Sequence, residues 1–122
     1  MTKLADVIDF SAIEDLRLLQ RPGRPDLVNE LIQMFIIAFE AGLITIKKAV
    51  SDSDLKVLSA TSHSLKSSAS CLGATTLANL LLKLEKLSNG DLEDESFDKL
   101  ASLIAVEYEK AKNALETLIA KV

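Results

Sequence analysis

Hydrophobic positions recur every three or four residues along most of the chain, which is the period of one face of an α-helix. Five stretches show this pattern, and they predict helices over about residues 12–20, 25–50, 54–72, 75–88 and 95–122. The last four are long and amphipathic, and their connections are short. We therefore expect an all-α protein: an antiparallel up-and-down four-helix bundle with a short additional N-terminal helix, folded as one domain over residues 1–122.

Residues that cap or break helices separate these stretches. Ser11 and Glu14 have the spacing of a capping box, which favours a helix start at the first of them. The two prolines and one glycine of residues 21–25 end that helix. Residues 51–54 alternate Ser and Asp, which make good caps, and Gly73 suits a helix C-terminus.

The apolar stripe of each long helix is its expected core face. Two of these stripes belong to successive helices in the middle of the chain. The stripe of the helix over 25–50 contains Val28, Leu31, Ile32, Phe35, Ala38, Phe39, Gly42, Ile46 and Val50, and the stripe of the next helix contains Leu55, Leu58, Ser62, Leu65, Ala69 and Leu72.

Composition and charge remove several classes of protein. Apolar residues make up 48% of the chain and aromatic residues only 4%, which favours packed helices over a β-sandwich. A net charge of -4 argues against nucleic acid as a partner. One Cys and one His exclude a disulfide framework and a Cys/His zinc site, and the longest apolar stretch, 34–46, is interrupted by Glu40 and too short for a bilayer. The first residues do not have the basic, apolar pattern of a leader, so we expect the protein in the cytoplasm, without a membrane partner.

The single imidazole, His63, is the candidate for chemistry. At about 100° per residue it lies roughly 130° from the centre of its helix's apolar stripe, so we expect it to face solvent. Its helix face also carries Lys56, Ser59, Lys66, Ser67 and Ser70. A neutral imidazole nitrogen is a good nucleophile, and the Lys66 ammonium, one turn away, suits phosphoryl oxygens. The chain has no G-x-x-x-x-G-K-[ST] loop, so we expect no ATP site.

The run S-H-S-L-K-S-S-A-S-C-L-G-A at residues 62–74 resembles the signature A-H-x-L-K-G-S-x-x-x-L-G-A of histidine-containing phosphotransfer (HPt) domains. Leu77 and the pair Leu84–Glu85 fit the family's downstream positions. The resemblance extends over roughly residues 10–120 and implies a four-helix bundle with an exposed histidine in the middle of one helix.

The resemblance implies a phosphorelay intermediate. His63 would accept a phosphoryl group from the aspartyl phosphate of one receiver domain and pass it to the aspartate of another, with Lys66 stabilising the phosphoryl group. The implied partners are response-regulator receiver domains and a hybrid sensor histidine kinase. Mg²⁺ is expected on the receiver, with no cofactor on this chain, which we expect to be a monomer. We expect exposed apolar residues of the first helix, such as Ile13 or Leu16, to contribute to docking.

One departure from the signature leaves an alternative open. Ser67 stands where the family commonly has Gly, beside the imidazole, and either limits the approach of a receiver or donates a hydrogen bond to the phosphoryl group. The alternative function is a non-phosphorylated helical adaptor that binds receiver domains. A hydrolytic or metal-dependent enzyme ranks last, because the sequence offers too few groups for its chemistry. Whether a phosphoryl carrier without a kinase module counts as an enzyme stays open.

Overall fold

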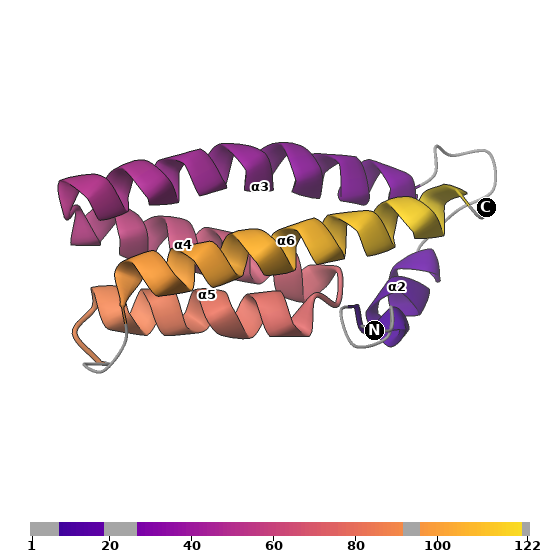
Figure 1. Cartoon of the computed structure of the whole chain (residues 1–122). Helices are drawn as coiled ribbons and strands as arrows, with labels where there is room; N and C mark the ends of the chain where they lie inside the picture. The colour runs from indigo at the N-terminus through magenta and orange to yellow at the C-terminus, as the bar shows by residue number, and fades with distance from the viewer. Residues whose placement is uncertain (1–7, 19–26, 92–95, 121–122) are drawn as a thin grey trace.

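The computed structural model describes residues 8–18, 27–91 and 96–120, and all its regular elements in these ranges are helices (Figure 1). They are α2 (Phe10–Arg17), α3 (Leu27–Asp52), α4 (Leu55–Cys71), α5 (Thr75–Ser88) and α6 (Phe97–Ala120). The four long helices pack as a bundle, and α2 lies across one end of it (Figure 1). The expected all-α fold, with its additional short N-terminal helix, is confirmed.

Each long helix packs against the next one in sequence, and α6 closes the bundle by packing against α3. The interface of α3 with α6 contains the aromatic cluster. The rings of Phe39 and Tyr108 stack with their centroids 4.8 Å apart, and Phe35 packs against both.

The Tyr108 hydroxyl donates to Glu40 Oε2 at 2.9 Å, and Lys112 Nζ donates to the same oxygen at 2.9 Å. Burial, with the nearby Glu40 carboxylate, raises the pKa of Tyr108 well above its ordinary value, so the phenol stays neutral and a donor.

The interface of α3 with α4 depends on a close approach at Gly42. A Cβ atom at this position would lie 2.7 Å from Leu65 Cδ1. Leu65 is buried, and it precedes Lys66 on α4. The absence of a side chain at Gly42 therefore lets the inner face of α4 sit directly against α3, and this contact fixes which face of α4 points to water.

Gly73 ends α4 as expected and also anchors the N-terminal segment. With a φ of 78°, it allows the Gly73 N–H to donate to the Ser70 carbonyl at 3.1 Å and the Ala74 N–H to donate to the Ala69 carbonyl at 2.9 Å. This is the Schellman pattern of a helix C-terminus. The Gly73 carbonyl accepts a hydrogen bond of 2.6 Å from the Asp9 N–H, and a Cβ atom on Gly73 would collide with the Asp9 carbonyl.

The start of the first helix differs from the prediction. The helix begins at Phe10, and Asp9 replaces Ser11 as its capping residue: Asp9 Oδ1 accepts from the Ser11 N–H at 3.0 Å and from its hydroxyl at 2.6 Å. A carboxylate is a stronger acceptor than a hydroxyl at the positive end of a helix, and the backbone of Asp9 is already held by Gly73. The helix ends at Arg17, and the expected residues 19 and 20 lie outside the described part of the chain.

The expectation that Ile13 is exposed for docking was wrong, because it is buried in the core. The same prediction named Leu16, whose side chain lies outside the described part of the structure. Two residues expected in the buried stripes are exposed, so these predictions were also wrong. Ala38 lies at the edge of the core face of α3. Leu55 is the first residue of α4, where a helix has fewer neighbours. Helix α6 begins at Phe97, and residues 92–95 lie outside the described ranges.

Helix α3 is apolar on more than its core face. An 18-residue window within it reaches a mean hydropathy of 1.7, enough for a membrane span by length and composition. Its inner face supplies Ile32, Phe35, Phe39 and Ile46 to the bundle core, but only 22% of that window is buried. Its outer face keeps large apolar side chains in solvent.

Ser62 and Ser88 give a matched pair for testing the core. Ser62 is fully buried in α4, and its hydroxyl has no hydrogen-bond partner among the described residues. An unpaired buried hydroxyl costs about 1–3 kcal/mol. We therefore expect Ser62→Ala to raise the free energy of unfolding by about 1 kcal/mol, measured by urea denaturation followed by circular dichroism.

The control is Ser88→Ala. The Ser88 hydroxyl is also buried but donates to the Leu84 carbonyl at 2.7 Å, so this substitution should give no stabilisation. Equal stabilisation by both substitutions would show that helix propensity, and not the unpaired hydroxyl, is responsible.

Candidate functional site

His63 lies in the middle of α4 on the face that points away from the core. The helix starts cleanly because Asp54 Oδ1 accepts from the Val57 N–H at 3.2 Å. Leu58, Ser62, Leu65 and Ala69 are buried against the bundle. The His63 side chain is 63% exposed, as its angle from the apolar stripe predicts.

A carboxylate from the neighbouring helix forms hydrogen bonds with both His63 and Lys66. Glu85 of α5 places Oε2 2.9 Å from His63 Nδ1 and Oε1 2.8 Å from Lys66 Nζ. The Glu85 side chain is only 16% exposed, and that of Lys66 is 24% exposed. The cluster is thus a His–Glu–Lys group at the boundary between α4 and α5, with the imidazole as its most exposed member.

The protonation of the cluster follows from these contacts. The hydrogen bond from Lys66 lowers the pKa of Glu85, the hydrogen bond from His63 adds to this effect, and desolvation opposes both. An ionised carboxylate only accepts hydrogen bonds, so the neutral His63 ring carries its proton on Nδ1 and donates it to Glu85. The lone pair of the neutral ring then belongs to Nε2.

Sequence reasoning placed His63 and Lys66 correctly on one face but missed Glu85 as a member of the site. Glu85 lies 22 residues beyond His63 along the chain and reaches it only because α5 packs beside α4. The one signal was the Leu84–Glu85 pair, which the resemblance singled out without giving it a role.

Ser67 is exposed beside the imidazole, but its hydroxyl turns toward its own helix. Ser67 Oγ donates to the His63 carbonyl at 3.3 Å. Ser70 and Lys56 are exposed on the same face, whereas Ser59 is half-buried and donates to Asn89 Oδ1 at 2.8 Å. The surface around His63 therefore combines the short side chains of Ser67 and Ser70 with the longer ones of Lys56 and Lys66.

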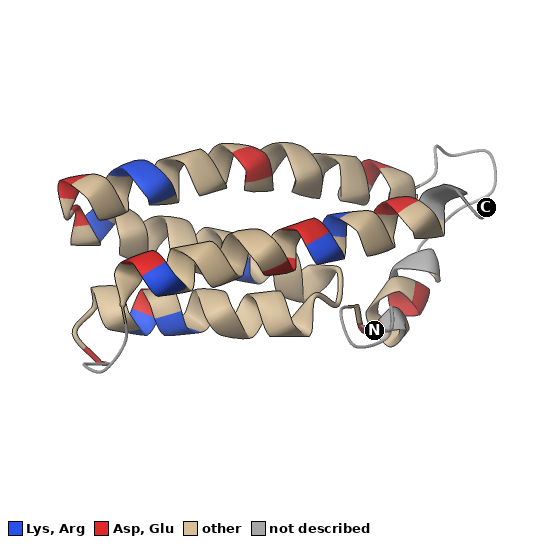
Figure 2. Cartoon of the chain, in the orientation of Figure 1, with Lys and Arg blue, Asp and Glu red and all other residues tan. Residues whose placement is uncertain are grey.

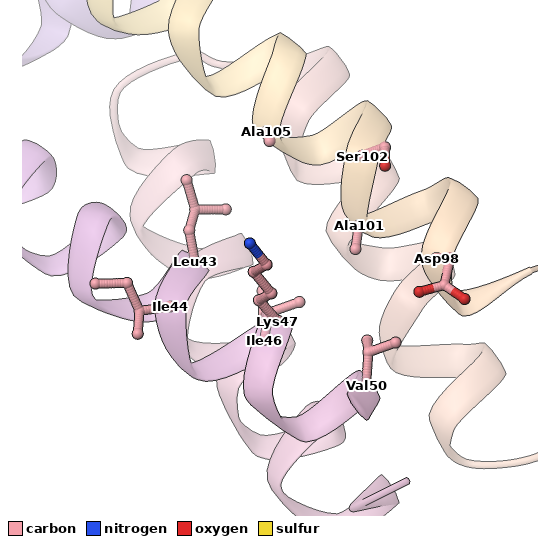
Figure 3. Close-up of a pocket in the computed structure, with 9 residues that line it drawn as sticks. All are labelled: Leu43, Ile44, Ile46, Lys47, Val50, Asp98, Ala101, Ser102 and Ala105. Atoms are coloured by element: carbon pink, nitrogen blue, oxygen red, sulfur yellow. The ribbon is translucent and has the colours of Figure 1, made fainter. Parts of the chain in front are cut away.

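Among the described residues, grooves lie on both sides of α3, and one of them adjoins this face. A groove of about 360 Å³ lies between α3 and α4, where Ser67, Ser68 and Cys71 meet Met34 and Ala38. The other, of about 430 Å³, lies between α3 and α6, with Lys47 and Asp98 among its lining residues (Figure 3). The members of the His–Glu–Lys cluster line neither groove.

Comparison with known protein families matches residues 30–121 to the Hpt domain. The match covers most of the chain, including all of α4, α5 and the described part of α6, so the protein belongs to the Hpt domain family. A search of curated proteins finds no match. Membership implies a phosphotransfer role in a phosphorelay, and Hpt domains interact with receiver domains and histidine kinases in such intracellular signalling pathways.

The tautomer of His63 tests the geometry of the cluster directly. When the His63 ring is neutral, we expect ¹⁵N NMR to show a pyrrole-type Nδ1 and a pyridine-type Nε2, because the Glu85 carboxylate accepts from Nδ1. Glu85→Ala should abolish this preference. Lys66→Ala is the control, since it leaves the carboxylate in place, and a protonated Nε2 in the unchanged protein would contradict the assignment.

Proposed function

We propose that Nε2 of His63 accepts a phosphoryl group from the aspartyl phosphate of one receiver domain and transfers it to the aspartate of another. The observation that carries this proposal is the His63–Glu85 contact, which occupies Nδ1 and leaves Nε2 as the nitrogen available for reaction in a side chain that is 63% exposed. This proposal specifies the phosphorelay role that the family implies.

The transfer step needs no auxiliary base. The Nε2 lone pair forms a bond to phosphorus while the bond between phosphorus and the aspartyl oxygen breaks, and the electron pair leaves with the receiver's carboxylate. The ring gains positive charge as the bond forms, and the Glu85 carboxylate at Nδ1 stabilises that charge without taking the proton. The same steps in reverse deliver the phosphoryl group to a second receiver.

Lys66 and the receiver supply the remaining stabilisation. The Lys66 ammonium lies one turn from the ring, and rotation of its side chain brings it from Glu85 to the phosphoryl oxygens. Mg²⁺ is assigned to the receiver, and the relay partners are response-regulator receivers together with a hybrid sensor histidine kinase in the cytoplasm. The short side chains around His63 and the groove between α3 and α4 favour docking of a receiver on this face.

Phosphotransfer from a labelled receiver tests the two site residues. We expect His63→Gln to accept no acid-labile, alkali-stable phosphate. Lys66→Ala should slow acceptance by about 10–100-fold, the value of one hydrogen bond to a charged group. Lys47→Ala, which removes an exposed ammonium from α3, should stay close to the unchanged protein. Label that persists in His63→Gln would eliminate His63 as the acceptor.

The adaptor alternative is tested at Ser67. If the serine obstructed phosphoryl transfer, Ser67→Gly would increase the transfer rate by orders of magnitude. We expect a change of less than about threefold, because the hydroxyl is bonded to the His63 carbonyl and not directed over the ring. A receiver that binds the unchanged protein without stoichiometric transfer, and transfers only to Ser67→Gly, would establish the adaptor function instead.

A further inference from the structure

The outer face of α3 carries a row of apolar side chains in solvent. Met34, Ile37 and Ile44 are 64%, 71% and 73% exposed, and Ala41 is exposed between them. Along this 26-residue helix, charged residues stand mainly near the two ends (Figure 2). Soluble proteins seldom leave a contiguous row of large apolar residues uncovered, so this face indicates an interaction surface.

The spacing of these residues is that of a helix-pairing seam. Residues 34, 37, 41 and 44 follow alternating steps of three and four, the a/d pattern by which two helices pack side by side. At 100° per residue they fall within an arc of about 80°, on the side of the helix opposite its buried stripe. The occupant that fits such a seam is another helix.

The seam is also symmetric about Phe39. Ile37 and Ala41 lie two residues to either side of it, and Met34 and Ile44 lie five residues to either side. An antiparallel copy of α3 centred at this level therefore places Met34 opposite Ile44 and Ile37 opposite Ala41 of the second copy. This is the self-complementary arrangement that a two-fold axis requires.

The charges next to the seam follow the same symmetry. Glu30 and Lys48 are both exposed, lie nine residues to either side of Phe39, and point in the direction of the seam. In the antiparallel pair, Glu30 of each copy meets Lys48 of the other, which gives two ion pairs of opposite charge. A parallel pair would instead place like charges side by side.

We propose that the protein forms a symmetric dimer in which α3 packs antiparallel against α3 of a second copy, through Met34, Ile37, Ala41 and Ile44, with Glu30–Lys48 ion pairs at both ends. This departs from the monomer expected from the sequence. From residue 30 to 48 the seam is about 27 Å long and one helix wide, so the dimer is weak, with a dissociation constant of roughly 10–100 µM.

The dimer does not depend on the phosphotransfer proposal. It leaves the His63 side of α4 open, but it covers Met34, which also lines the groove between α3 and α4. His63 contacts Glu85 on the α5 side of α4, whereas the seam lies on the outer face of α3. Both copies therefore keep an accessible imidazole. His63→Gln, which eliminates phosphate acceptance, should dimerise as the unchanged protein does, so failure of either proposal is visible separately.

Sedimentation equilibrium of the full chain tests self-association. We expect the mass to rise from 13.2 kDa at low micromolar concentration towards twice that value at about 500 µM. Ile37→Glu and Ile44→Glu should remain monomeric, and both sites are exposed enough for the fold to survive, which circular dichroism checks. Val106→Glu, at a 54% exposed apolar site on α6, is the matched control and should dimerise normally.

Charge reversal tests the register. Glu30→Lys alone and Lys48→Glu alone each place like charges at both ends, and each should weaken the dimer by about three- to tenfold. Mixing the two variants should restore association, because in the mixed dimer both end pairs are again of opposite charge. The double variant should also dimerise.

Three results would overturn the proposal. The first is a monomeric mass at about 500 µM. The second is a mixture of the charge variants that associates no better than either alone. The third is that Ile37→Glu self-associates as the unchanged protein does but no longer binds a receiver or lipid vesicles. This result would assign the face to that partner instead.

Discussion

The contact on which the site depends is the hydrogen bond between the Glu85 carboxylate and Nδ1 of His63. It orients the ring and favours a proton on Nδ1. Under the proposed reaction it also places a negative charge beside the ring as the ring becomes positive. The contact exists only because α5 packs beside α4 in a fixed register. The turn at Gly73 connects the two helices: its left-handed conformation ends α4 and allows α5 to start two residues later. A glycine ten residues from the histidine thus takes part in positioning the chemistry.

Much of the fold was predictable because helix periodicity is a local property of the sequence. The spacing of Leu58, Leu65 and Ala69 defined the inner face of α4, and the angle between that face and His63 then predicted an exposed imidazole. Lys66 followed from the same helix geometry. These predictions needed only the positions of residues on one helix.

The features that were missed depend on contacts between elements. Glu85 reaches His63 across a helix interface, and no spacing along the chain indicates that. Ser11 fits the capping-box pattern, yet Asp9 caps the helix because its backbone is held by Gly73, which is distant in sequence. Ile13 is buried because α2 packs against the end of the bundle. Local patterns identify candidates, and tertiary packing decides among them.

The His–Glu–Lys cluster also affects the charge that partners encounter. With a neutral ring, an ionised carboxylate and an ammonium, the cluster is electroneutral before transfer. Under the proposed reaction, a dianionic phosphoryl group joins it while the ring gains a single positive charge, so the charge balance becomes negative. The departing receiver simultaneously regains its own carboxylate. Transfer therefore makes the surface around His63 more negative, so a receiver that meets this surface encounters a different charge before and after phosphorylation.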